Sequence, residues 1–136
     1  MFVIRNLAFL LGRILIAALF LYDGYLTVKA PNAAAGFIGR VGLKLPVDAG
    51  TLALALAAVM LVGGVLIIIG LWTRVPAILL AAFCVATAVL FHYHPNDANE
   101  MIQMGKDLGL AGGFLFLAAA GPGIYSIDGR RRSGAI

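Results

Sequence analysis

The stretch AGTLALALAAVMLVGGVLIIIGL, residues 49–71, decides the fold of this chain, because it is apolar and carries no charged side chain. A helix needs about 20 such residues to cross roughly 30 Å of hydrocarbon. One similar apolar stretch precedes it, at residues 7–28, and two follow it, at residues 75–92 and 101–120. The sequence therefore predicts an all-α membrane protein, a bundle of four transmembrane helices that forms a single domain over residues 1–136.

The composition agrees with this fold class. Hydrophobic residues make up 62% of the chain and charged residues 12%, whereas a soluble domain carries about 25% charged residues. The mean hydropathy is +1.03. Peptide groups in lipid need internal hydrogen-bond partners, and the alternating pattern of a membrane barrel is absent, so the spans must be helices.

The first apolar stretch has a second interpretation, a cleaved signal peptide. Arg5 precedes it, and Val28-Lys29-Ala30 loosely resembles a cleavage site. The stretch is longer than the roughly 7–15 residues of a typical signal core, however, and it contains Arg13 and Asp23. We therefore expect the first helix to remain in the protein.

Basic residues near the ends of the spans predict the orientation. Arg5, Arg74 and residues 130–132 fall on one side of a four-span bundle, whereas the link at residues 94–100 on the other side is acidic. Positive charge favours the cytoplasm, so both termini should be cytoplasmic and the protein should lie in a bacterial inner membrane. The net charge of +4 follows from this topology, and no basic and aromatic array indicates nucleic-acid binding.

The links between the spans are short, with one exception. Residues 33–45 mix apolar residues with Arg40 and Lys44, which predicts a short helix on the membrane surface between spans one and two. The tight turn at residues 72–74 makes spans two and three antiparallel neighbours. Asp97 is expected to cap the fourth helix.

Polar residues from three predicted helices fall toward the outer leaflet, where they are expected to form one pocket: Asp23, Lys29, His92, His94, Lys106 and Asp107. Lys106 is the strongest candidate, because it lies inside the fourth helix. A lysine beside a histidine can bind the carbonyl oxygens of a quinone or exchange protons with it. The alternative is interfacial charge with aromatic anchoring.

Arg13 is a separate candidate in the inner half of the bundle. Ala17, Phe20 and Gly24 share its helix face, which suits helix contact. Arg13 then either forms an anion or headgroup site, or extends to the cytoplasmic interface as a structural residue.

Metal and thiol chemistry have little support in the sequence. His92 and His94 have no clear third and fourth ligand partner, so we expect no metal site. Cys84 is the only cysteine, which excludes an intrachain disulfide and leaves packing as its expected role.

Glycines at positions 105, 109 and 113 recur at intervals of four residues. Such a seam allows close approach of helices, either within the bundle or between copies in a homo-oligomer.

The chain resembles the DoxX family in motifs spread over nearly its whole length: Gly12-Arg13 followed by Leu19-Phe20 and Gly24, Gly70-Leu71-Trp72-Thr73-Arg74 with Ala77, Phe91-His92, Lys106-Asp107-Leu108, Gly121-Pro122-Gly123 and Ser126-Ile127-Asp128. The resemblance implies a small four-helix protein of the bacterial inner membrane. It also implies kinship with a subunit of thiosulfate:quinone oxidoreductase and with proteins linked to membrane redox and thiol stress. The positions it points to are Arg13, Lys29, His92, Lys106, Ser126 and Asp128. Asp128 is expected to pin the tail, with Arg74 as its partner.

Two functions of different classes follow. In the first, the protein is a quinone-interacting redox component without a covalent cofactor, and the candidate contact residues are Arg13, Asp23, Lys29, His92 and Lys106. In the second, it is a non-catalytic membrane anchor or assembly subunit for a soluble redox partner. A transporter is disfavoured, because four spans leave little room for alternating access.

Overall fold

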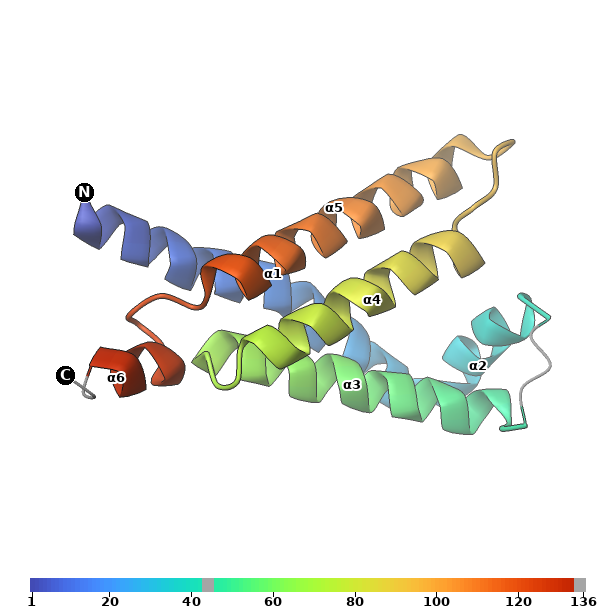
Figure 1. Ribbon diagram of the computed structural model, residues 1–136. Helices are drawn as coiled ribbons and strands as arrows, with labels where there is room; N and C mark the ends of the chain where they lie inside the picture. Colours follow the sequence, from blue (N-terminus) through green and yellow to red (C-terminus); the bar gives the residue numbers. More distant parts are fainter. Residues whose placement is uncertain (43–45, 134–136) are drawn as a thin grey trace.

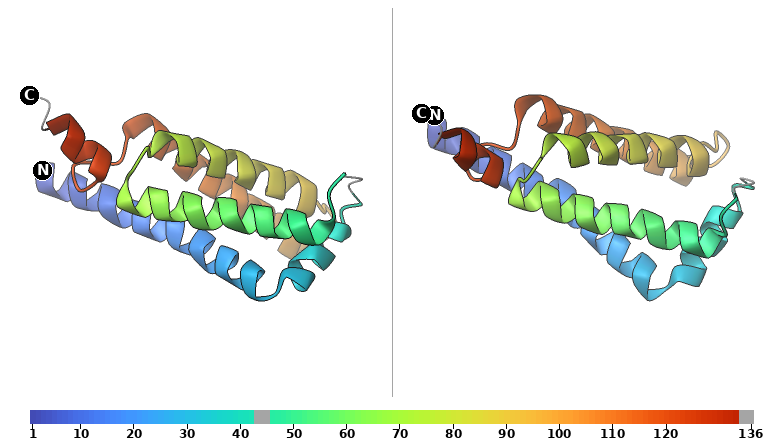
Figure 2. Two further views of the ribbon diagram at one scale, coloured as in Figure 1. Left: turned by 90° about the horizontal axis from the view of Figure 1, so that it is seen from below. Right: turned by 60° about the horizontal axis from the view of Figure 1, so that its bottom comes forward.

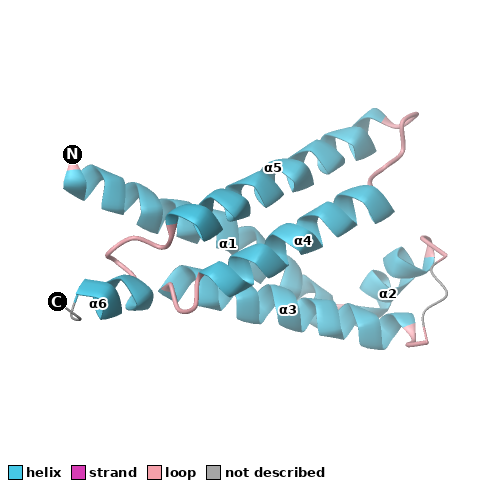
Figure 3. Cartoon of the chain, viewed as in Figure 1, coloured by secondary structure: helices cyan, strands magenta, loops and turns pink. Residues whose placement is uncertain are grey.

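All regular structure in the described part of the chain is helical. The computed structural model describes residues 1–42 and 46–133, with side chains as far as residue 131. The helices follow one another as α1 (Phe2–Lys29), α2 (Pro31–Gly39), α3 (Ala49–Ile69), α4 (Arg74–Phe91), α5 (Ala98–Ala120) and α6 (Ile127–Ser133). Figure 3 shows helices joined by loops and turns, with no strand in the described residues. The predicted all-α class is confirmed.

Three helices in the described residues, α1, α3 and α4, are long and apolar enough to cross a membrane. The helix α5 has 23 residues, but Glu100, Lys106 and Asp107 make its first half more polar. That α5 forms a fourth span, and that both termini are cytoplasmic, stay predictions.

The four long helices pack as two antiparallel pairs. The helix α1 packs mainly against α3, and α4 packs mainly against α5, while the tight α3–α4 turn joins the pairs (Figure 1). The start of α1, α6 and this turn lie at one end of the molecule, which we call the terminal end (Figure 2). The opposite end carries α2 and the α4–α5 loop, and we call it the α2 end.

The core between the pairs is built from alanines and larger apolar side chains that fit between them. Its buried residues are Ala17, Phe20, Ala57, Met60, Ile67, Ala77, Leu80, Ala81, Cys84, Ala111, Phe114 and Leu117. The rings of Phe20 and Phe114 meet edge to face, with centroids 5.2 Å apart. Arg13, Ala17, Phe20 and Gly24 are all buried on one face of α1, as their spacing predicts.

Local sequence sets the helix ends. The carboxylate of Asp97 accepts hydrogen bonds from the backbone N–H groups of Asn99 (2.9 Å) and Glu100 (3.3 Å), so the predicted cap of α5 is confirmed. The helix α3 ends at Gly70, which has φ +68°. Glycine is the residue that adopts this left-handed conformation without steric cost.

The helices differ from the predictions mainly at α1, α2 and α6. The helix α1 begins at Phe2 rather than residue 7, so its first turns project beyond the α3–α4 turn. The short helix predicted over residues 33–45 is α2, which begins at Pro31, because proline fits the first turn of a helix, and ends at Gly39. That α2 lies on the membrane surface stays a prediction. Lys44, in the second half of that predicted segment, lies outside the described residues. The short helix α6 was missed; the Ser126 hydroxyl begins it by accepting a hydrogen bond from Gly129 N–H (2.9 Å).

Candidate functional site

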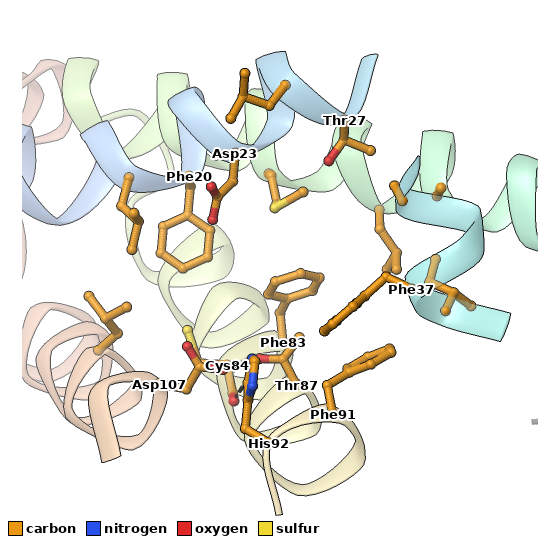
Figure 4. Close-up of a pocket in the computed structure, with 18 residues that line it drawn as sticks. Phe20, Asp23, Thr27, Phe37, Phe83, Cys84, Thr87, Phe91, His92 and Asp107 are labelled. Carbon is orange, nitrogen blue, oxygen red and sulfur yellow. Dashed lines mark hydrogen bonds and ion pairs between the residues drawn. The ribbon is translucent and has the colours of Figure 1, made fainter. Parts of the chain in front are cut away.

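A cavity of about 280 Å³ lies between the two helix pairs toward the α2 end. Figure 4 shows side chains from α1, α2 and α4 pointing into it, with Asp107 reaching in from α5. The residues that line it are Leu19, Phe20, Asp23, Leu26, Thr27, Ala34, Phe37, Ile38, Ala53, Leu56, Met60, Phe83, Cys84, Thr87, Phe91, His92, Asp107 and Leu110. The helices α1 to α5 therefore all contribute to one site.

Aromatic rings form much of the cavity wall. Phe20 meets Phe83 edge to face, with centroids 6.1 Å apart. Phe37 of α2 stacks on Phe91 of α4, with centroids 5.1 Å apart and planes 18° from parallel. The stack joins α2 to α4, so α2 borders the cavity on one side (Figure 4).

A polar cluster of Thr87, His92, Glu100 and Asp107 lies on the α4–α5 side of the cavity. The Thr87 hydroxyl is 2.7 Å from Asp107 Oδ2 and 3.0 Å from the Cys84 carbonyl oxygen. His92 Nδ1 lies 2.7 Å from Glu100 Oε2, and His92 Nε2 lies 3.9 Å from Asp107 Oδ2. The imidazole therefore stands between a carboxylate in the cavity and a carboxylate that is 36% exposed.

Asp23 approaches the same cavity from α1, on the opposite side (Figure 4). Its side chain makes no hydrogen bond with the described residues, and as a residue it is exposed although it belongs to a long apolar helix. Such a carboxylate is costly in lipid and usually marks a functional position. The cavity thus has carboxylates on two sides.

The structure brings together three members of the predicted outer cluster, Asp23, His92 and Asp107, and leaves the others outside the cavity. Lys106 is exposed, and its Nζ donates to Gln103 Oε1 at 3.0 Å. Lys29 is also exposed and lies over the ring of Tyr25, 5.3 Å from its centroid.

His94 lines a different cavity, on the outer side of the Phe37–Phe91 stack. This cavity of about 460 Å³ also borders Arg40, Asp97 and Glu100. Glu100 lines this second cavity and His92 lines the cavity between the helix pairs. The hydrogen bond between the two side chains therefore links the two cavities.

Arg13 lies far from this site, at the terminal end, where it is 1% exposed. Its Nη1 donates to the Ile68 carbonyl oxygen at 3.2 Å, and its Nη2 donates to the Tyr125 carbonyl oxygen. Its Nε is buried without a hydrogen-bond partner among the described residues. Arg13 therefore ties α1 to the end of α3 and to the loop before α6.

Asp128 completes this arrangement. Its Oδ1 accepts from Trp72 N–H at 3.1 Å, and its Oδ2 accepts from the Thr73 N–H at 2.9 Å and the Thr73 hydroxyl at 3.0 Å. The expected salt bridge with Arg74 is not found among the described residues. Asp128 instead caps α4, because the free N–H groups at a helix start are better partners for a short carboxylate than a long exposed arginine. We call Arg13, Gly70, Thr73, Ser126 and Asp128 the terminal clasp.

The pKa of Asp128 reflects these contacts. Partial burial raises the pKa of the carboxyl, but the hydrogen bonds from Thr73 and Trp72 outweigh it, so the pKa of Asp128 is lowered. The carboxylate is therefore ionised at neutral pH, as the cap requires.

Sequence reasoning missed the parts that Thr87 and Phe37 play in the cavity and saw Glu100 only as a helix start. Thr87 gave one weak signal, a polar residue between Cys84 and Phe91 on a helix face that is otherwise apolar. Phe37 gave none, because its place over the cavity depends on how α2 folds back onto α3 and α4.

Comparison with known proteins supports the family resemblance. The DoxX family model matches residues 8–93. Over 132 residues, 93% of this chain and 91% of the relative, the sequence is 30% identical to Inner membrane protein YphA of Escherichia coli (strain K12). Over 66 residues, 48% of this chain and 51% of the relative, it is 44% identical to Inner membrane protein YqjF of the same organism. No solved structure matches significantly. The protein is an inner-membrane protein and belongs to the DoxX family.

Proposed function

We propose that the protein binds the headgroup of a quinone or quinol in the cavity between its helix pairs, as a component of membrane redox or thiol-stress chemistry. One observation carries the proposal: aromatic walls meet the polar cluster of Thr87, His92 and Asp107 inside an otherwise apolar bundle. A quinone headgroup suits this combination, because its ring is flat and apolar while its two oxygens need hydrogen-bond partners.

The size and surroundings of the cavity suit a headgroup. Its volume of about 280 Å³ lies just below the roughly 300–1,000 Å³ of sites for drug-sized molecules. A single ring system then fits, whereas an isoprenoid tail would leave the cavity. Asp23 lines the cavity and is also exposed at the bundle surface, so we propose that a lipid-soluble molecule enters beside it.

Each polar residue has a definable part. Reduction of a bound quinone takes up two electrons and two protons, and oxidation of the quinol releases them. Asp23 and Asp107 face the cavity from α1 and α5, so their carboxylates can accept the two hydroxyl protons of a quinol. The Thr87 hydroxyl can turn from Asp107 to donate to a quinone oxygen, and His92 Nε2 can donate to it when both ring nitrogens carry a proton.

A proton held at Asp107 has a route toward the outer surface. His92 lies between Asp107 and Glu100, so its ring can receive a proton at Nε2 and release one at Nδ1. Thr87 has one hydroxyl proton and two neighbouring acceptors, the Cys84 carbonyl and Asp107. When Thr87 donates to the carbonyl, its 2.7 Å contact with Asp107 needs the proton on the carboxyl group.

The electrons come, in this proposal, from a soluble partner oxidoreductase. The chain has a single cysteine, so it cannot form a dithiol of its own. We further propose that the terminal end is cytoplasmic and that α5 completes a four-span bundle. The quinone cavity then lies in the outer half of the membrane.

The second candidate function is a non-catalytic anchor or assembly subunit. Two glycines of the predicted seam favour it, because a Cβ added at Gly105 or Gly109 would meet no atom within 4 Å. This face of α5 can therefore take a second copy of the chain or another helix at close range. Gly113 is different, since a Cβ there would lie 2.9 Å from Ile16 Cδ1 within the bundle.

Quinone binding to the purified protein in phosphatidylcholine nanodiscs tests the proposal, with His92→Ala and Asp107→Asn as site variants. Lys106→Ala is the matched control, since Lys106 neighbours Asp107 on α5 but lies outside the cavity lining. We expect saturable binding that weakens about tenfold or more in the site variants, because each removes a hydrogen bond to a charged group. The control should bind normally. All variants should retain their melting temperature within a few degrees. No saturable binding by the folded, unsubstituted protein would favour the anchor instead.

A further inference from the structure

Two neighbouring cavities follow the contact between α1 and α5 at the terminal end, far from the quinone cavity. The deeper one, of about 360 Å³, is apolar and borders Gly12 and Phe116. The second, of about 390 Å³, is more polar and borders Arg5 and the loop after α5. Phe9 and Ala120 line both cavities, so the two form one groove, which we call the α1–α5 groove.

The groove is wide because small residues line it. A Cβ added at Gly12 would meet no atom within 4 Å, so the space beside this glycine of α1 is unfilled by the protein. Phe116 on the opposite wall is 80% exposed. The apolar part is thus an open groove on the surface of the bundle. It extends over about two helix turns of α1, from Phe9 to Ile16.

Two arginines make the groove positive. Arg13 lines its apolar part, and the guanidinium donates only to backbone carbonyls, with Nε unpaired. Arg5 lines its polar part and contacts the ring of Phe2, 5.4 Å from the centroid. Neither arginine forms an ion pair within the described residues, where the ion pairs all involve His92. A buried charge without a counter-ion exerts a strong field, because the surrounding dielectric is low.

One carboxylate also borders the polar part of the groove. Asp128 lines it, but both carboxylate oxygens accept hydrogen bonds from Trp72 and Thr73. Its oxygens are therefore held at the start of α4, and its single negative charge offsets only part of the positive charge of Arg5 and Arg13.

We propose that the α1–α5 groove binds one anionic phospholipid of the inner leaflet. The acyl chain lies over Gly12, and the phosphate lies beside Arg5. A zwitterionic lipid fills the same apolar volume but brings its own positive charge, so the two arginines favour the anionic lipid. Basic sites between helices on the cytoplasmic side are known to select such headgroups. The groove is separate from the quinone cavity, so this site stands whether or not a quinone binds.

Lipid retention tests this site. The protein is extracted from nanodiscs that contain equal amounts of phosphatidylcholine and phosphatidylglycerol, and native mass spectrometry counts the lipids that remain bound. We expect one tightly held phosphatidylglycerol on the unsubstituted protein. Arg5→Gln should lower the preference for phosphatidylglycerol about fivefold, which is the contribution of one basic residue near an anionic headgroup. Gly12→Leu fills the apolar part of the α1–α5 groove and should abolish retention of either lipid.

Each variant has a matched control. Gly105→Leu changes another glycine that faces open space, but on α5 outside the groove. Arg40→Gln removes an exposed arginine at the α2 end. Both controls should retain the lipid as the unsubstituted protein does, and circular dichroism should show all four variants to be helical.

Two outcomes would overturn the proposal. In the first, the protein retains phosphatidylcholine and phosphatidylglycerol equally, or Arg5→Gln and Gly12→Leu behave like their controls. In the second, inorganic phosphate alone raises the melting temperature in phosphatidylcholine nanodiscs and Arg5→Gln abolishes that rise. The groove would then bind a free anion at its polar end and no lipid.

Discussion

The terminal clasp and the cavity between the helix pairs are both polar regions inside an apolar bundle, but their polar groups are paired differently. In the clasp, Arg13 and Asp128 bind mainly backbone groups of other segments. In the cavity, His92 and Asp107 interact with other side chains, and Asp23 makes no hydrogen bond within the described residues.

This difference separates structural residues from residues available to a ligand. Backbone partners are fixed by the fold, so the hydrogen bonds of the clasp hold segments together, and Arg13 acts on a lipid in the α1–α5 groove only through its charge. Side-chain partners can rotate away, and an unpaired carboxylate gains a partner when a ligand arrives. The DoxX motifs occur in both regions, so the motifs alone do not tell the two roles apart.

Gly70→Ala should break the clasp and have the largest effect on stability. Gly70 has φ +68°, and an added Cβ would overlap both the Arg13 guanidinium and the Ser126 side chain. We expect the free energy of unfolding to fall by about 3–5 kcal/mol, the sum of backbone strain and overpacking. Thermal or denaturant unfolding in detergent measures this loss.

The control for that experiment is Gly105→Ala. Gly105 lies inside α5 with open space around its Cα, so alanine there should stabilise the helix by up to about 1 kcal/mol. Equal effects of the two substitutions would show that the clasp does not hold the fold.

Asp128→Asn should have a smaller effect that depends on pH. Burial raises the pKa of Asp128, but the hydrogen bonds from Thr73 and Trp72 lower it by more than burial raises it. The folded protein therefore favours the ionised form. The stabilisation is therefore present above the pKa of the unfolded state, roughly 3.9, and is lost as the pH falls through the lower pKa of the folded state.

At pH 7 we expect Asp128→Asn to cost about 1–2 kcal/mol, because a neutral amide replaces the charged acceptor of the hydrogen bonds from Trp72 and Thr73. The difference in melting temperature between the unsubstituted protein and the variant should shrink as the pH falls below about 4. A difference that stays constant from pH 7 to pH 3 would contradict the assigned role of the carboxylate. Ile127→Ala, an exposed neighbour on α6, serves as the control.

Much of the fold follows from the sequence, because a membrane limits the choices. Residues 49–71 have to be helical in lipid, and the short link at Gly70–Thr73 forces α3 and α4 to be antiparallel. Spacing on a helix also predicted the buried face of α1 through Arg13 and Phe20. These are local properties, so one sequence suffices to read them.

The site was predicted only in part, because it depends on rotation and packing of whole helices. Lys106 and Asp107 are consecutive on α5, so they point about 100° apart, and only Asp107 faces the cavity. Hydropathy places both residues at one depth in the membrane but does not give the rotation of α5. The same limit hid the stack of Phe37 on Phe91, which joins segments that are far apart in the chain.

Asp23→Asn should have the smallest effect on stability, and it tests the cavity side of the comparison. The Asp23 side chain has no hydrogen bond to lose within the described residues, and it faces the same cavity as Asp107, another carboxylate. Removing its charge relieves repulsion between like charges and the cost of holding a carboxylate in lipid. We therefore expect the free energy of unfolding to stay within about 0.5 kcal/mol of the unsubstituted value, or to rise. Quinone binding should weaken in the same variant, because one of the two acceptors for the quinol is lost. A large loss of stability would place Asp23 with the clasp as a structural residue, whereas unchanged stability with weaker binding would confirm that the fold leaves this carboxylate free for a ligand.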